Sequence, residues 1–315
     1  MPLLGGLDTI VAGSTPANCC LAPTTRAPFD LLETAEEDSA DMQAEEPFLA
    51  AQRPIAASSP LRSSRVPLLV AAFAGGLVMF LAIEPTKPWI LLVLTALVAV
   101  GTDGILREHP HAARERDIAW TAPLLFLPTL IVLGAGLFLE DALSGYLVLP
   151  GVLIASIMMA AVLYAQHVSI DGASASYATA RFVLNIGTYL TAFALFAVVY
   201  AFDVSLVPAA LTVGLVSLLL AVEVLREAEA DPVRALVFAA AVGLVVAEAR
   251  WALYFLPLES YLAGVFLLIV FYVASGLVQH HLNDDLHSSV ITEFALMGVL
   301  GVIIVTLGRV FEAGA

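Results

Sequence analysis

"FVLNIGTYLTAFALFAVVYAFDVSLVPAALTVGLVSLLLAVEVL", residues 182–225, holds two long apolar runs joined by the short connector AFDVS at 201–205. A helix needs about twenty apolar residues to cross a bilayer, and each run meets that length. The connector leaves room only for a turn. The stretch therefore predicts two transmembrane helices that follow each other directly.

The same criterion extends the pattern to both sides of this stretch. Connectors such as EPTKP, LEDALSG, EAEADP and FLPLES are too short to hold a further soluble domain. We therefore predict an all-α, polytopic membrane helix bundle over residues 67–312. Its nine predicted spans are 67–84, 88–105, 119–139, 145–166, 182–202, 205–225, 233–255, 259–280 and 290–311.

Composition supports the same class of protein. The chain is 60% hydrophobic and 13% charged, whereas a soluble domain is about 45–50% apolar and about 25% charged. The net charge is −15, and eight acidic residues lie close together between Asp30 and Glu46. We predict that residues 1–66 form a disordered acidic cytoplasmic tail, a candidate for recruiting a protein partner. With 13 lysines and arginines in all, no nucleic-acid surface is predicted.

The distribution of basic residues predicts an orientation, because loops on the cytoplasmic side carry more lysine and arginine than loops outside. Lys87, Arg250 and Arg309 fall on the predicted outer side. The inner side receives Arg53, Arg62, Arg65, Arg107, Arg114, Arg116, Arg181, Arg226 and Arg234. We expect a cytoplasmic amino terminus and an external carboxyl terminus. The preference for arginine over lysine, together with abundant alanine, valine and leucine, is compatible with a GC-rich bacterium, whose inner membrane is then the expected location.

A dense group of possible ligands lies in the predicted inner turn between the last two spans. If the eighth span continues as a helix, His280, Asp284 and His287 share one face at positions i, i+4 and i+7. Imidazole and carboxylate ligands suit a divalent transition metal. Glu293, about one turn into the next span, is then the candidate catalytic base.

A plain polar turn explains the same residues. Asn283, Asp284 or Asp285 can end one helix, and Ser288 or Ser289 can cap the next. All six histidines, His109, His111 and His167 included, fall on predicted inner connectors or span ends. This gathering on one side favours a site, but it leaves both interpretations open.

Ionisable residues within a span are candidates for function. Glu248 lies inside the seventh span, where it needs a partner from another helix or must be protonated, and Arg250 follows it on a different face. Together they are candidates for proton or ion coupling. Arg250 is expected to extend into an aromatic belt with Trp251 and Tyr254. Glu223, near the inner edge, is expected to reach water.

The segment AEARWALYFLP…FYVASGLVQHHL (247–257 and 271–282) resembles bacterial multi-pass membrane proteins classed as domains of unknown function. This resemblance implies no activity. Prenyltransferases, CAAX-type proteases and histidine-box hydroxylases are excluded, because the residues that define each of them are missing.

Three functions remain open at this point. The leading interpretation is a noncatalytic membrane component, either a scaffold or an accessory subunit, because no motif meets the standard for an enzyme. The second is a metal-dependent enzyme that acts on a lipid or isoprenoid at the cytoplasmic face through the inner turn. The third is a proton-coupled transporter that uses Glu248.

Overall fold

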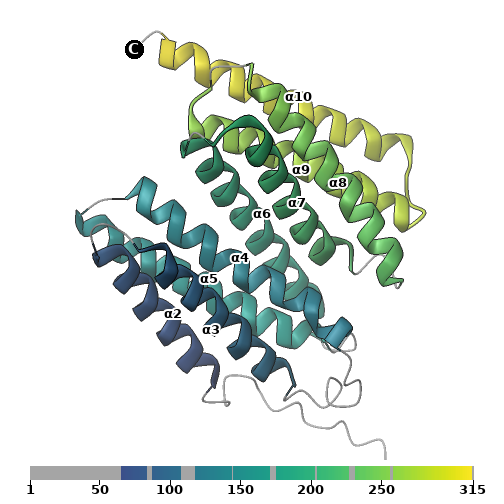
Figure 1. The fold of residues 1–315 in the computed structure, drawn as a ribbon. Coiled ribbons are helices and arrows are strands. Elements are labelled where there is room, and N and C mark those ends of the chain that lie inside the picture. The colour runs from purple at the N-terminus through teal and green to yellow at the C-terminus, as the bar shows by residue number, and fades with distance from the viewer. Residues whose placement is uncertain are drawn as a thin grey trace, which may run out of the picture. The chain divides into compact units, whose positions relative to one another are not determined.

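The computed structural model describes residues 65–83, 87–107, 118–143, 145–170, 175–202, 204–226, 231–255 and 258–313. Residues 1–64, where the acidic tail is predicted, lie outside this part of the chain, as do His109 and His111. Figure 1 shows helices following one another along the described chain. They are α2 (Arg65–Ala82), α3 (Pro88–Arg107), α4 (Ile118–Ala142), the 3₁₀ turn η2 (Gly145–Leu147), α5 (Val148–Ser169), α6 (Tyr177–Ala201), α7 (Leu206–Leu225), α8 (Pro232–Leu253), α9 (Ser260–Leu282) and α10 (Ser288–Ala313).

The predicted fold class is confirmed. Within the described residues, nine helices have the length and apolar composition needed to cross a membrane, and they correspond one for one to the predicted spans. The helices extend beyond several predicted ends. α6 begins at Tyr177 rather than at 182, and α9 continues to Leu282 rather than to 280. The apolar run marks the part of a helix in hydrocarbon, whereas the helix itself continues into the more polar boundary.

α6 lies at the centre of the helix packing. It packs against α4, α5, α7 and α9, and more than half of its apolar window is buried. The buried ring of Phe196 on α6 meets Phe271 on α9 edge to face, with ring centroids 6.3 Å apart. Lipid is as apolar as these side chains, so close packing rather than transfer from water holds the helices together.

α10 is the least buried of the spanning helices, with 17% of its window inside the protein. It packs mainly on α9, where the ring of Phe294 lies against Gly276. Large apolar side chains cover its remaining surface, including Leu296, Val299 and Val310. This surface suits contact with lipid tails or with another apolar helix.

Candidate functional site

The turn between α9 and α10 is built by the backbone at the end of α9. The N–H of Asp285 donates to the carbonyl oxygen of His280 over 3.1 Å, and the N–H of Asp284 donates to that of His281 over 3.3 Å. Asp284 has a φ of 54°. These two bonds, together with the left-handed conformation of Asp284, form a Schellman motif, which ends a helix. Aspartate is one of the few residues that tolerate this conformation. The helix therefore stops at Leu282.

This ending separates the predicted metal ligands. His280 lies within α9, Asp284 lies in the left-handed turn, and His287 lies just before α10, so the three do not share one helical face. Among the described residues, no three His, Cys, Asp or Glu side chains are grouped so that they could hold a metal ion. Metal binding and catalysis at this turn stay predictions.

The two histidines have other neighbours. The His280 ring meets the ring of Phe294 edge to face at 5.7 Å between centroids. His287 lies in the turn itself, where its Nδ1 is 3.1 Å from Oδ1 of Asp285, and both side chains are exposed. Glu293, the predicted base, is exposed on α10. These residues form a solvated polar turn next to the aromatic contact between His280 and Phe294.

Glu248 and Arg250 lie on different faces of α8, as predicted. Glu248 is exposed, and it lines a groove on the outside of α7 and α8. Arg250 is only 5% exposed, and its guanidinium carbon lies 4.8 Å from the centroid of the Tyr200 ring on α6. A buried guanidinium over an aromatic face gains a cation–π attraction. The expected extension of Arg250 into an exposed aromatic belt is therefore wrong.

The structure also brings together a charged group that the sequence did not reveal, made of Arg181, Glu223 and Arg226. Oε1 of Glu223 lies 3.7 Å from Nη1 of Arg181 and 3.4 Å from Nη2 of Arg226. Nη2 of Arg181 also donates to the backbone carbonyl of Glu223 over 3.5 Å. Glu223 is 1% exposed, so the expectation that it reaches water is wrong.

This charged group ties the beginning of α6 to the end of α7. Arg181 is 6% exposed, whereas the side chain of Arg226 is 28% exposed and so retains contact with the surroundings. The two positive charges around the Glu223 carboxylate neutralise it. Without them, burial of this charged group would be strongly unfavourable. The sequence alone identifies Arg181 only as a positive charge on the inner side. The available signal was Glu223 itself, an acidic residue within an apolar run, which requires a cationic partner.

The comparisons with known proteins agree with this picture. Neither any curated protein nor any solved structure matches the chain. One family, described as "Protein of unknown function (DUF5656)", matches residues 64–308, which begin one residue before α2 and extend into α10. The predicted resemblance to a family of unknown function is confirmed. Because this match covers well over half of the chain, the protein, a multi-pass membrane helix bundle, belongs to the DUF5656 family.

Proposed function

We propose that this protein is a noncatalytic component of a membrane assembly, either a scaffold or an accessory subunit. The observation that carries the proposal is the outward position of Glu248. Ionisable side chains at membrane depth almost always face the interior of a bundle or a water-filled cavity, and they pair there. Glu248 instead faces out of the bundle, where a second protein is the natural source of a partner.

The depth of Glu248 makes this argument stronger. It lies five residues before the end of α8, or about 8 Å along the axis at helical rise. The exposed side chain of Trp251, which marks the interface level of a membrane protein, lies between Glu248 and that end. The short glutamate side chain therefore lies beneath the interface. At this depth it needs a hydrogen-bond donor or a positive charge, which a partner protein can supply.

The surroundings of Glu248 suit a partner helix. The groove between α7 and α8 has a volume of about 420 Å³, and Ala210 and Ala247 are among the small residues in its wall. Small residues allow the backbones of two membrane helices to approach closely. The other wall residues are apolar or weakly polar: Val207, Leu211, Leu244, Trp251 and Ala252. A helix with one polar side chain opposite Glu248 fits this surface.

The proposed location is a bacterial inner membrane, with the amino terminus in the cytoplasm and the carboxyl terminus outside. The excess of arginine on one set of connectors supports this orientation. In this arrangement the acidic tail predicted for residues 1–66 is on the cytoplasmic side, where it is available to a second partner with a basic surface.

Photo-crosslinking in intact membranes tests the proposal. A photoreactive amino acid at Leu244, an exposed residue of the groove, is expected to form one protein adduct of defined mass. The same amino acid at Leu153, an equally exposed leucine on α5, serves as the control and is expected to form no such adduct.

Variants of Glu248 then test whether the adduct requires its carboxyl group, which distinguishes specific recognition of a partner from chance contact. The substitution Glu248→Leu is expected to abolish the adduct from position 244, while Glu248→Gln, which keeps a hydrogen-bonding group, retains part of it. Adducts with lipid alone, or a protein adduct that is indifferent to Glu248→Leu, would contradict the proposal. Proton-driven flux in proteoliposomes that Glu248→Gln abolishes would favour the transporter instead.

A further inference from the structure

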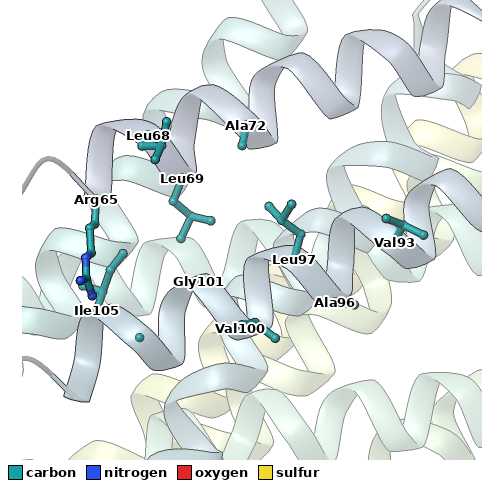
Figure 2. A pocket seen from close by; sticks show the side chains of 11 residues that line it. Arg65, Leu68, Leu69, Ala72, Val93, Ala96, Leu97, Val100, Gly101 and Ile105 are labelled. Carbon is teal, nitrogen blue, oxygen red and sulfur yellow. The ribbon is translucent and has the colours of Figure 1, made fainter.

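The grooves on the surface of the bundle differ in polarity. Figure 2 shows the groove between α2 and α3, whose lining is apolar except for Arg65 at one end. Lipid tails satisfy the apolar part of such a surface. A smaller groove, which we call the α9–α10 groove, is lined by two tyrosines, Tyr189 of α6 and Tyr272 of α9. The presence of tyrosine in a groove that opens toward lipid requires an explanation.

The α9–α10 groove lies at the middle depth of the membrane. On α10 it extends from Met297 to Ile304, about 14 to 24 Å from the beginning of a helix that is about 39 Å long at helical rise. Tyr272 lies about 15 Å from the nearer end of α9. The hydrocarbon core of a bilayer is about 30 Å thick, so the groove reaches neither headgroup region. A phospholipid keeps its polar part at the surface and cannot place it in this groove.

The two tyrosine hydroxyls differ in their partners. Tyr189 hydrogen-bonds with the side chain of Ser275. Oγ of Ser275 donates its own hydrogen to the carbonyl oxygen of Phe271 over 2.7 Å, so Tyr189 is the donor to Ser275. Tyr272 is 37% exposed, and its hydroxyl forms no hydrogen bond with any residue that the structure describes. Because there is no water at this depth, the O–H group of Tyr272 needs an acceptor from outside the bundle.

Ring contacts hold Tyr272 in position. Its ring meets that of Tyr189 edge to face, with centroids 5.6 Å apart, and lies tilted against Phe294 of α10 at the same distance. Tyr189 in turn meets the buried ring of Phe271 at 5.9 Å. Centroid distances in this range stabilise aromatic pairs. Tyr272 is therefore fixed beside the groove before a ligand binds, which lowers the entropic cost of binding.

These features select a class of ligand. It dissolves in the bilayer, reaches the midplane and accepts a hydrogen bond there. It is also small around the acceptor, because the groove has a volume of about 250 Å³, which is below the range of about 300–1,000 Å³ typical of drug-sized ligands. A transmembrane helix is a poorer match, because its backbone carbonyls are already bonded within the helix.

An isoprenoid quinone meets each of these requirements. Its ring is flat, and its two carbonyl oxygens accept hydrogen bonds without donating any. Its tail is apolar, which suits the rest of the groove lining, including Leu268, Leu300 and Ile304.

We propose that the α9–α10 groove binds an isoprenoid quinone, with one ring carbonyl accepting a hydrogen bond from Tyr272 and the tail along α10. The site performs binding alone and requires no electron transfer. It is independent of Glu248 and its partner, because the groove at Glu248 is formed by α7 and α8, whereas this one is formed by α6, α9 and α10.

Native mass spectrometry of the full-length protein in detergent tests the proposal. The probes are decylubiquinone and decylbenzene, which carries the same tail on a ring without carbonyl groups. Decylubiquinone is expected to bind more tightly than decylbenzene. Tyr272→Phe removes only the hydroxyl. It is expected to weaken decylubiquinone binding about fivefold, the effect of one hydrogen bond, and to leave decylbenzene binding unchanged.

Matched controls accompany these variants. Tyr261→Phe makes the same change in the first turn of α9, outside the groove, and is expected to bind like wild type. Leu300→Trp places a large ring in the groove and is expected to weaken binding of both probes. Leu296→Trp makes the same change at another exposed leucine of α10, outside the groove, and is expected to bind like wild type.

Several results would overturn the proposal. Equal affinity for the two probes, or an affinity for decylubiquinone that Tyr272→Phe does not change, would exclude recognition of the carbonyl by Tyr272. Decylubiquinone binding that survives Leu300→Trp would place the quinone elsewhere on the protein. A photoreactive residue at Met297 that labels a protein in intact membranes would identify a partner helix as the occupant of the groove.

Discussion

Gly214 of α7 and Gly243 of α8 bring two helix backbones into direct contact: a Cβ added to Gly243 would lie 2.6 Å from the carbonyl oxygen of Gly214. The atom in the way belongs to the backbone, so no side-chain rotation can relieve the collision. α7 and α8 form the most extensive helix pair among the described elements. The close approach of their backbones at these two glycines allows many residues of the two helices to come into contact. The same pair carries Glu248 and its groove.

Replacing Gly243 by leucine is therefore expected to destabilise the bundle. Overpacking of a filled interior costs about 1–3 kcal/mol, and the rigid neighbour places this site at the upper end. Thermal unfolding in detergent, followed by circular dichroism, measures the effect as a lowered melting temperature. Gly298→Leu, on the open surface of α10, is the control. Equal melting temperatures for the two variants would show that α7 and α8 can separate without cost.

The buried charges at the ends of α6 and α7 allow a second test. Glu223→Leu leaves Arg181 buried without its carboxylate, and removal of one partner from a buried pair costs about 3–5 kcal/mol. The double substitution Arg181→Met with Glu223→Leu is expected to recover most of this loss, because it replaces the pair by apolar side chains of similar size. Arg226 remains partly exposed in both variants.

Thermal unfolding of wild type, both single variants and the double variant completes a mutant cycle. A coupling free energy near zero would contradict the proposed role of the ion pair as a tie between the two helices. A double variant that is less stable than either single variant would have the same consequence.

The helices themselves could be predicted from sequence, because membrane spans depend on a local property. Long apolar runs and short polar connectors identify each helix without knowledge of its neighbours, and all nine corresponded. The ends of the helices were harder to predict from the sequence. The polar residues before 182 do not resemble a span, yet the helix begins at Tyr177 and so brings Arg181 into the packed interior.

The charged contacts depended on tertiary structure and could not be read from spacing. Arg181 and Glu223 are 42 residues apart on different helices. The position of Arg250 over Tyr200 likewise depends on how α8 packs beside α6. For the inner turn, the sequence offered a helical face and a helix end as alternatives. The left-handed conformation of Asp284 selects the helix end.

The predicted metal site has its own direct test. Because α9 ends at Leu282 and His280 lies against Phe294, we expect protein purified without chelators to contain no stoichiometric zinc, iron or manganese. The double variant His280→Ala with His287→Ala is expected to keep the wild-type metal content. Elemental analysis by mass spectrometry measures both proteins. Stoichiometric metal that the double variant loses would contradict this expectation and restore the enzyme interpretation, with Glu293 as its candidate base.

The nine spans found among the described residues make a prediction about the two ends of the chain, since an odd number of crossings places the termini on opposite sides. The arginine distribution predicts a cytoplasmic amino terminus. A green fluorescent protein fused to the amino terminus is expected to fluoresce, and alkaline phosphatase fused to the carboxyl terminus is expected to be active, because each reporter works on one side only. Phosphatase inserted in the connector after Arg226 is the control and should be inactive. Active phosphatase at both positions would place the connector after Arg226 and the carboxyl terminus on the same side of the membrane. Three crossings by α8, α9 and α10 would put them on opposite sides, so this result would show that not all three helices cross.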